Sequence, residues 1–241
     1  MATARQARIE AVEVIAAHTR VLHVVCSEPL GFVGGQYVIV DSGLRRADGK
    51  AVKRAYSIVS ADREQSRFVL AVKQLPAGPG SSFMHGLEPG SELRFSGPWG
   101  KLVPHADARG SALVFATDTG VTAALGLLRG ARFGPLIAST SFVWLRESAQ
   151  CFVPDGFVRA CLPAGIGSVR IGELPAGDHP ERIAVARHAA SDALARERPL
   201  HVFVAGDGAV NYALLDDLIA AGVPATRDNL ESFFNMPKKS A

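Results

Sequence analysis

The chain has 241 residues, of which 48% are apolar and 20% charged, so it is long enough for two modest domains with buried cores. Its net charge of +3 is too small to indicate a nucleic-acid partner, and no nucleic-acid-binding motif occurs. No apolar run could span a bilayer, so we expect no membrane insertion, and the N-terminus lacks the layout of a signal peptide. The cysteines, Cys26, Cys151 and Cys161, form neither an even disulfide set nor a metal-ligand spacing, which favours a reducing cytoplasm.

The N-terminal part of the chain has the pattern of short strands. Its apolar segments are rich in valine and aromatic residues, often alternate apolar with polar positions, and are separated by turns with Gly or Pro. These segments are residues 8–16, 20–27, 36–42, 55–61, 67–75 and 91–97. Six such segments predict a small antiparallel barrel.

From residue 111 the pattern changes to buried strands that alternate with helices. The predicted strands are residues 111–117, 140–147 and 200–206, and residues 156–163 are a candidate strand. The predicted helices are residues 121–130, 177–199 and 209–222, and Asp178 is the expected N-cap of the second. This alternation predicts a parallel sheet with helices on both faces. We therefore predict a barrel domain over residues 1–106 and an α/β domain over residues 107–241.

The segment KRAYSIVS, residues 53–60, carries three chemically distinct side chains where a strand begins. In an extended strand Arg54 and Tyr56 project to one face, while Ser57 turns to the other with its backbone amide in reach. Arginine binds phosphate through a planar fork, and tyrosine stacks while its hydroxyl still donates a hydrogen bond. A flavin needs such a set, because its phosphate, its ring and its reactive nitrogen each require a different partner.

These residues resemble the flavin signature Arg-x-Tyr/Phe-Ser of the ferredoxin–NADP reductase superfamily. The resemblance implies that Arg54 holds the flavin phosphate, that Tyr56 packs against the flavin, and that Ser57 lies by its reactive nitrogen. Tyr56 and Ser57 would then be the catalytic residues. The alternative is a solvated arginine beside a buried strand tyrosine.

Two later segments extend the resemblance within the barrel. Residues 77–90, AGPGSSFMHGLEPG, are similar to the family's next flavin motif, and Gly80, Ser81 and Ser82 would offer backbone N–H groups to a phosphate at a helix start. An ordinary loop with a serine cap is the alternative. Residues 97–100, GPWG, reproduce the family's Gly-Pro-x-Gly stretch beside the flavin and the nicotinamide approach.

The nucleotide-binding motif is only partly kept. Residues 118–123, DTGVTA, have the strand–turn–helix context of a dinucleotide site and resemble the family's Gly-Thr-Gly-x-x-Pro. Thr119 and Gly120 agree with it, whereas Asp118 replaces the first glycine and Ala123 the proline. A carboxylate beside a pyrophosphate is disfavoured by repulsion unless it points away.

Two C-terminal segments also resemble the family. Residues 202–210, VFVAGDGAV, correspond to its Cys-Gly-Pro segment beside the nicotinamide, with Gly206 kept and Ala205 in place of the cysteine. Glu231, Phe233 and Phe234 are similar to its C-terminal Glu-x-Phe/Tyr-Phe ending, and the resemblance implies an aromatic tail that covers the flavin until nicotinamide displaces it. Two phenylalanines that only complete the core are the alternative.

Arg146 follows the second predicted parallel strand, at the end where open sheets bind ligands. The resemblance implies an arginine near here that contacts the ribose or its 2′-phosphate, so we expect a site that accepts NADPH and tolerates NADH. Glu147 follows directly, and a carboxylate there would instead suit the free ribose hydroxyls of NADH. A solvated Arg–Glu pair without a ligand is the alternative.

The segment LRRADGKAVKR, residues 44–54, concentrates basic charge around a turn sequence. Its basic residues are Arg45, Arg46, Lys50, Lys53 and Arg54, against the single acid Asp48. A solvated hairpin tip and a docking patch for an acidic partner or phosphate both explain it.

Over nearly the whole chain, the resemblance implies a flavin-dependent NAD(P)H oxidoreductase with FAD, or FMN, as cofactor. Electrons would pass from NADPH or NADH to a separate acidic redox protein, which is a ferredoxin, a flavodoxin or an oxygenase component. The scattered cysteines cannot build an iron–sulfur site in this chain. Two alternatives stay open: a flavin-bearing relay or binding subunit with a vestigial nucleotide domain, and an unrelated α/β domain in which RAYS is accidental.

Overall fold

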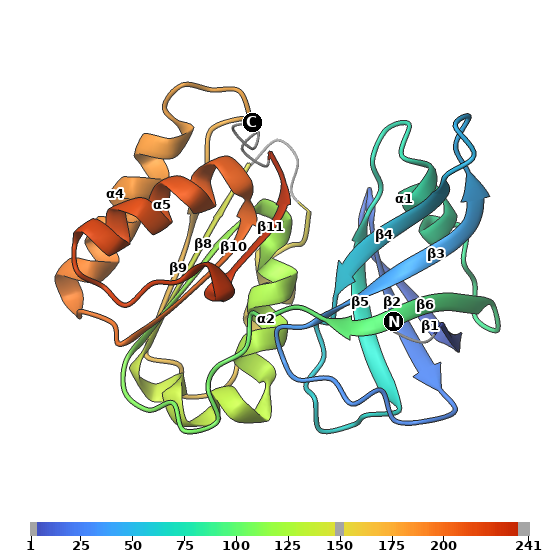
Figure 1. Cartoon of the computed structure of the whole chain (residues 1–241), viewed down its shortest axis with the longest axis horizontal. Coiled ribbons are helices and arrows are strands. Elements are labelled where there is room, and N and C mark those ends of the chain that lie inside the picture. The colour runs from blue at the N-terminus through green and yellow to red at the C-terminus, as the bar shows by residue number, and fades with distance from the viewer. Residues whose placement is uncertain (1–3, 148–151, 236–241) are drawn as a thin grey trace.

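The computed structural model of the chain describes residues 4–147 and 152–235, which form two sheets side by side (Figure 1). The first is antiparallel, with strand order β4-β3-β6-β1-β2-β5. Its strands are β1 (Arg5–Ala16), β2 (Thr19–Cys26), β3 (Tyr37–Arg45), β4 (Ala51–Ser57), β5 (Arg67–Lys73) and β6 (Glu92–Trp99). Ile58, just after β4, bridges to Leu70 of β5, so the two edge strands meet and the predicted barrel is confirmed.

The barrel interior is filled by the side chains that alternate along these strands. Leu22, Phe68 and Leu70 are completely buried. The rings of Phe68 and Phe95 meet edge to face with their centroids 5.6 Å apart. The period of two that predicted the strands is therefore the period that packs this core.

The second sheet is parallel throughout, with strand order β11-β10-β7-β8-β9. Its strands are β7 (Ala112–Thr117), β8 (Thr140–Arg146), β9 (Ser168–Glu173), β10 (His201–Asp207) and β11 (Leu230–Phe234). Every residue of β7 is buried, as expected for a central strand covered on both faces. The predicted parallel sheet is confirmed, whereas β9 and β11 were not among the predicted strands.

Helices cover both faces of this parallel sheet. The helices are α1 (Pro79–His85) in the barrel domain, then α2 (Val121–Arg129), α3 (Asp155–Cys161), α4 (Arg182–Arg196) and α5 (Gly208–Ala220). Short 3₁₀ turns are η1 (Asp118–Gly120), η2 (Ala131–Ser139) and η4 (Arg227–Asn229). The helices α4 and α5 pack on one face, and α2 with α3 packs on the other.

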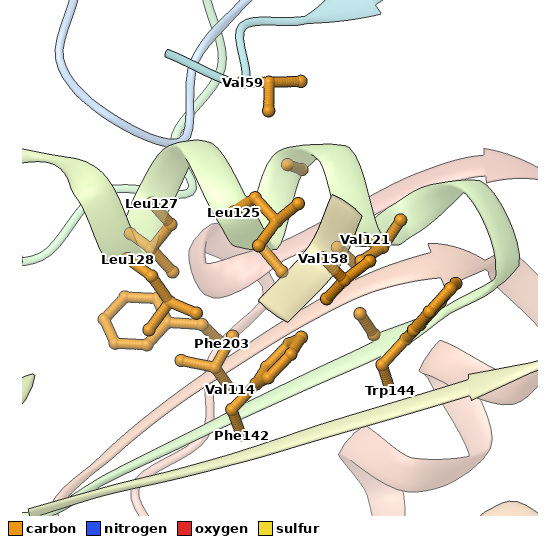
Figure 2. Close-up of a cluster of buried hydrophobic side chains, with 14 of the residues drawn as sticks. Val59, Val114, Val121, Leu125, Leu127, Leu128, Phe142, Trp144, Val158 and Phe203 are labelled. Carbon is orange, nitrogen blue, oxygen red and sulfur yellow. The ribbon is translucent and has the colours of Figure 1, made fainter. Parts of the chain in front are cut away.

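The helix α2 lies between the parallel sheet and the barrel (Figure 1). Figure 2 shows Val114, Phe142 and Trp144 of the sheet on one side of α2 and Val59 of the barrel domain on the other. These side chains belong to one buried cluster, so the two domains share a continuous core.

Two local predictions are wrong. Residues 156–163 were a candidate strand but belong largely to α3, because Phe157, Val158 and Cys161 have helical spacing and Val158 is fully buried under α2. The expected cap Asp178 lies outside α4, which begins at Arg182. A turn closed by a hydrogen bond from the His179 amide to the Ala176 carbonyl precedes that helix instead.

The domain boundary, the cysteines and the lengths of the helices can also be compared with the expectations from sequence. The predicted boundary between residues 106 and 107 lies in the segment between β6 and β7. Cys26 and Cys161 have free thiols, and Cys151 lies outside the described residues. Within residues 4–147 and 152–235, no helix has the length and apolar character needed to cross a bilayer.

The two domains meet through glycines that let backbones touch. A Cβ on Gly126 of α2 would lie 2.0 Å from the Ile58 carbonyl oxygen, and one on Gly34 would lie 2.4 Å from the Gly126 carbonyl oxygen. The Asp62 carboxylate bridges the same interface, because it accepts the Gly34 amide at 3.0 Å and the Ala131 amide at 2.9 Å. The position of α2 on the barrel is therefore fixed by close backbone contacts together with the Asp62 carboxylate.

The turn η4 and the strand β11 that follows it also contact the barrel domain. Lys101 pairs with Asp228 at 2.9 Å. Glu231 packs beside Tyr37 and Gly100, where burial raises the pKa of its carboxyl to about 7. This carboxyl therefore lies in the domain interface rather than in bulk water.

We expect Gly126→Ala to destabilise the fold by about 3 kcal/mol, because the new methyl group would meet a carbonyl oxygen of the barrel. The matched control is Gly156→Ala in α3, where a Cβ would have no atom within 4 Å and the helix should gain up to about 1 kcal/mol. Urea unfolding of both variants measures the difference. Equal effects of the two substitutions would show that the backbone contact does not constrain the interface.

We expect Glu231→Gln to weaken the pH dependence of stability. A carboxyl whose folded pKa is raised contributes stability that is present below its unfolded value and is lost as the pH rises through about 7. The wild-type free energy of unfolding should therefore fall on the order of 1–2 kcal/mol more than that of the variant between about pH 5 and about pH 8, after allowance for its partial exposure. The control is Glu92→Gln, an exposed glutamate of β6, which should follow the wild type. If the free energy of unfolding depends on pH identically in Glu231→Gln and the wild type, the Glu231 carboxyl does not have a raised pKa in the folded protein.

Candidate functional site

A cavity of about 430 Å³ opens between the barrel and the carboxyl ends of the parallel strands. Its barrel wall comes from β4, β5 and the segment that leads into α1. Its other wall comes from the ends of β7 and β8, from the start of α4 and from β11. The carboxyl ends of parallel strands are the usual ligand-binding edge of an open α/β sheet.

The end of β4 provides three chemically distinct groups of the barrel wall. Arg54, Tyr56 and Ser57 all line the cavity. The Tyr56 hydroxyl donates a hydrogen bond to the Gly80 carbonyl at 3.4 Å, and burial raises the pKa of Tyr56 to about 12. Tyr56 therefore stays a neutral donor with a flat apolar ring. Ser57 is only 5% exposed, so it lines the cavity from a well-packed position.

The start of α1 packs against Arg54. A Cβ on Gly80 would lie 2.7 Å from Cγ of Arg54, so glycine at this position lets the arginine side chain lie along the helix start. The Ser81 hydroxyl accepts the Leu75 amide at 3.0 Å and donates to the Gly78 carbonyl at 2.9 Å. Ser81 thus holds the turn before α1, and it lines the cavity.

On the opposite wall, glycines hold the turn after β7 against β10. A Cβ on Gly120 would lie 2.2 Å from the Ala205 carbonyl oxygen, and one on Gly206 would lie 2.3 Å from the Thr117 carbonyl oxygen. Both glycines permit close backbone approach. Thr119, between Asp118 and Gly120, lines the cavity.

An ionic cluster lies where β7 and β10 end. The Arg182 Nε donates to an Asp207 carboxylate oxygen at 2.9 Å, and its Nη2 donates to the Asp118 carboxylate. Nη1 of the same arginine donates to the Pro175 carbonyl. Asp207 also caps α5 by accepting the Ala209 amide at 2.9 Å. Two carboxylates thus share one guanidinium at the wall of the cavity.

Asp118 is anchored in a backbone conformation that most residues avoid. Its φ is +47°, and its carbonyl accepts the Trp144 indole N–H at 3.0 Å. Aspartate tolerates this left-handed region better than most residues do. The second oxygen of its carboxylate accepts the Glu147 amide at 3.0 Å, so Asp118 links the ends of β7, β8 and α4.

Most of the residues predicted from the flavin motifs line the cavity. Of the residues predicted from the nucleotide motifs, fewer do. The predicted residues that line the cavity are Arg54, Tyr56, Ser57, Ser81, Thr119 and Phe233. The predicted residues that do not line it are Gly80, Ser82, Gly120, Arg146 and Gly206.

Arg146 makes its contacts away from the cavity. Its guanidinium donates to Asp155 at 2.7 and 3.1 Å and lies over the Trp144 ring. Glu147, the next residue, does line the cavity.

Arg182 lines the cavity although it was not among the residues predicted from the sequence. It is the first residue of α4, where the helix dipole disfavours a cation, and its side chain is only 5% exposed. An arginine at such a position signals a carboxylate partner elsewhere in the fold, but the sequence does not show which one.

The barrel wall fits a flavin better than it fits a generic apolar ligand. On the barrel wall Arg54 supplies a cation and the Tyr56 ring is flat, and on the opposite wall Phe233 and Phe234 of β11 add aromatic surface. Two free thiols and no group of three metal-ligating side chains occur among the described residues. The donor set therefore matches an aromatic ligand that carries an anionic group.

The comparisons with known proteins agree with this fit. Residues 6–103 match the family model of the oxidoreductase FAD-binding domain. Ferredoxin–NADP reductase B of Sorangium cellulosum is 38% identical over 126 residues, which are 52% of this chain and 50% of that protein. NADH-cytochrome b5 reductase 1 of Pyricularia oryzae is 30% identical over 119 residues, which are 48% of this chain and 38% of that protein. The chain thus aligns with half or less of the length of these relatives.

The fold extends beyond the matched segment. The ferredoxin reductase in carbazole 1,9a-dioxygenase superposes with a TM-score of 0.74 at 17% identity, and the match covers 97% of this chain and 70% of that one. The similarity therefore includes the parallel-sheet domain as well as the barrel. Residues 6–103 thus match an oxidoreductase FAD-binding domain, and the two-domain fold of the chain is similar to that of a ferredoxin reductase.

Proposed function

We propose that this chain is a flavin-dependent NAD(P)H oxidoreductase that passes electrons from a nicotinamide nucleotide through bound FAD to a separate redox protein. One observation carries the proposal: Arg54, Tyr56 and Ser57 face a cavity in a segment that matches an FAD-binding domain. A bound flavin would supply both hydride acceptance and one-electron release. FMN would use the same barrel wall, and FAD is proposed because the matched family is described by it.

In this proposal each residue of the barrel wall has one role. Arg54 binds the flavin phosphate, together with backbone groups of Gly80, Ser81 and Ser82 at the start of α1. Arg54 suits this role because its side chain lies along that helix start. The Tyr56 ring packs on the flavin while its hydroxyl stays tied to the Gly80 carbonyl.

The remaining proposed roles concern the reactive part of the flavin. Ser57 donates a hydrogen bond to the reactive nitrogen from its buried position. Phe233, on the opposite wall, covers the ring until nicotinamide takes its place. No strong acid is needed, because hydride transfer moves no separate proton.

The nicotinamide nucleotide is proposed to approach the carboxyl ends of β7 and β10, where Thr119 and Gly120 form the turn after β7 and Gly206 lies near the end of β10. Arg146 is the proposed contact for the ribose or its 2′-phosphate, since it ends β8 one residue before Glu147, which lines the cavity. Release of Arg146 from Asp155 would be needed for that contact.

A flavin-bearing relay or binding subunit is the second candidate. The observation that favours it is the ionic cluster of Asp118, Arg182 and Asp207, which places two carboxylates at the nucleotide end of the sheet. Anaerobic titration of the purified protein with NADH and NADPH separates the two. Bleaching of the flavin absorbance supports the oxidoreductase, bound flavin without bleaching supports the relay, and a colourless protein that takes up no flavin contradicts both.

The proposed acceptor is an acidic redox protein such as a ferredoxin, a flavodoxin or an oxygenase component. The hairpin between β3 and β4 projects from the barrel and carries Arg45 and Arg46 (Figure 1). Lys50 pairs with Asp48 at 3.4 Å, and Lys53 pairs with Asp41 at 3.4 Å. The two arginines therefore supply the uncompensated charge that supports docking of an acidic partner.

We expect Arg54→Ala to weaken flavin binding by about 2–4 kcal/mol, because it removes a charge-assisted contact to phosphate. The measurement is the flavin-to-protein absorbance ratio after gel filtration. Arg67→Ala is the control, since Arg67 pairs with Glu10 and Glu64 on the barrel surface. Ser57→Ala should show the opposite pattern, with flavin retained and its reduction slowed. Full flavin retention by Arg54→Ala would contradict the phosphate assignment.

We expect the double variant Arg45→Glu, Arg46→Glu to lose electron delivery to an acidic protein acceptor and to show a flatter dependence on ionic strength. Turnover with a small artificial acceptor should survive, because the hairpin tip is remote from Ser57 along β4.

The control for this variant is Arg63→Glu, Arg132→Glu, which makes the same change in net charge at exposed positions of the β4–β5 connection and of η2. If both double variants lose delivery equally, total charge rather than this hairpin guides the acceptor. If the Arg45→Glu, Arg46→Glu variant loses as much turnover with the small artificial acceptor as with the protein acceptor, the substitutions have damaged the flavin site.

A further inference from the structure

Arg182 is held by two fixed contacts and one replaceable contact. Its Nε donates a hydrogen bond to Asp207 at the end of β10, and its Nη1 donates to the carbonyl of Pro175, which precedes α4. Neither acceptor residue lines the cavity. Asp207 is itself fixed, because it is fully buried and caps α5. Its carboxylate also accepts a hydrogen bond from the side-chain amide of Asn235 at 3.1 Å. Only the Nη2 bond reaches a carboxylate at the cavity wall, that of Asp118.

Asp118 takes up the hydrogen-bond donors that an anionic ligand would use here. Its carboxylate accepts both the Arg182 guanidinium and the Glu147 amide. Its side chain is 16% exposed, whereas that of Asp207 is completely buried. Asp118 is therefore the carboxylate of the cluster that a ligand in the cavity can meet and replace.

The phosphates of a dinucleotide approach this same place. In open α/β sheets they lie outside the carboxyl ends of the strands, close to a helix start. Here that position follows β7 and precedes α2, and Asp118 occupies it. A phosphate must displace the Asp118 carboxylate from Arg182 or be repelled by it.

We propose that Asp118 is an intramolecular competitor of the coenzyme phosphates, and that Arg182 is the cation for which the two compete. The inference rests on the proposed function, because it assigns residues of the nicotinamide nucleotide site. In the free protein Nη2 of Arg182 binds Asp118. In the complex the same nitrogen binds a phosphate oxygen, while Asp207 and the Pro175 carbonyl keep the guanidinium in place. The chain thereby lowers its own affinity for the coenzyme.

The test is calorimetric titration of the flavin-loaded wild type and of Asp118→Asn with NAD⁺ and with NADP⁺. Asparagine keeps an oxygen for the Glu147 amide and tolerates the positive φ, while it removes the competing charge. We expect both dissociation constants to fall roughly tenfold. The control is Asp217→Asn, which removes a carboxylate that pairs with Arg187 at 2.6 Å between α4 and α5, and it should change neither constant.

Two further variants keep the test decisive. Asp118→Gly also suits the positive φ and should tighten binding, so failure of one variant to fold leaves the other to measure. Adding Arg182→Lys to Asp118→Asn should reverse the gain in coenzyme affinity, because the planar guanidinium that binds phosphate is lost. Retention of the full gain in that double variant would overturn the role of Arg182.

The outcomes separate this inference from the proposed function. Unchanged or weaker coenzyme binding in both Asp118 variants overturns the inference, even where NADPH or NADH still bleaches the flavin. Tighter binding without any bleaching supports the inference and contradicts the oxidoreductase. If neither the wild type nor any variant binds a coenzyme although flavin stays bound, the competitor role of Asp118 and the proposed oxidoreductase function are both overturned. In that case there is no coenzyme with which Asp118 could compete.

Discussion

The direct contact between the backbone of α2 and that of the barrel is the constraint on which the rest of the molecule depends. Gly34 and Gly126 bring the two main chains so close that no side chain can intervene. Because α2 continues directly from β7 through η1, this contact also places the carboxyl ends of the parallel strands opposite β4. The cavity between the domains is a consequence of that placement, because its two walls belong to the elements that this contact holds together.

The two walls of the cavity differ in charge. The barrel wall presents Arg54, whereas the opposite wall presents Glu147 and the Asp118 carboxylate beside Arg182. Charges at the wall of a cleft act more strongly than charges in open solvent, because the surrounding protein screens them less than water does. The barrel wall is therefore the more favourable of the two for an anionic group, because the wall at β7 already holds a carboxylate beside its arginine.

Local patterns predicted the parts of the site that lie within one element. Arg54, Tyr56 and Ser57 lie within four consecutive residues of β4, so one short segment brings all three residues to the cavity. The cluster around Arg182 could not be predicted in this way, because Asp118, Arg182 and Asp207 come from three separate elements. The helix α3 was mistaken for a candidate strand, since a short apolar run has no period long enough to separate the two structures.

The sequence by itself determined the two-domain organisation, because alternation with a period of two requires a half-buried antiparallel sheet and continuous apolar strands require cover on both faces. It also brought Arg54, Tyr56 and Ser57 together within one short segment that lines the cavity. Only the tertiary structure decided what the substituted residues of the nucleotide motif do. Asp118 could have pointed into solvent, but its left-handed backbone and the approach of α4 direct its carboxylate to Arg182. That pairing depends on the packing of elements distant in sequence, which no local pattern encodes.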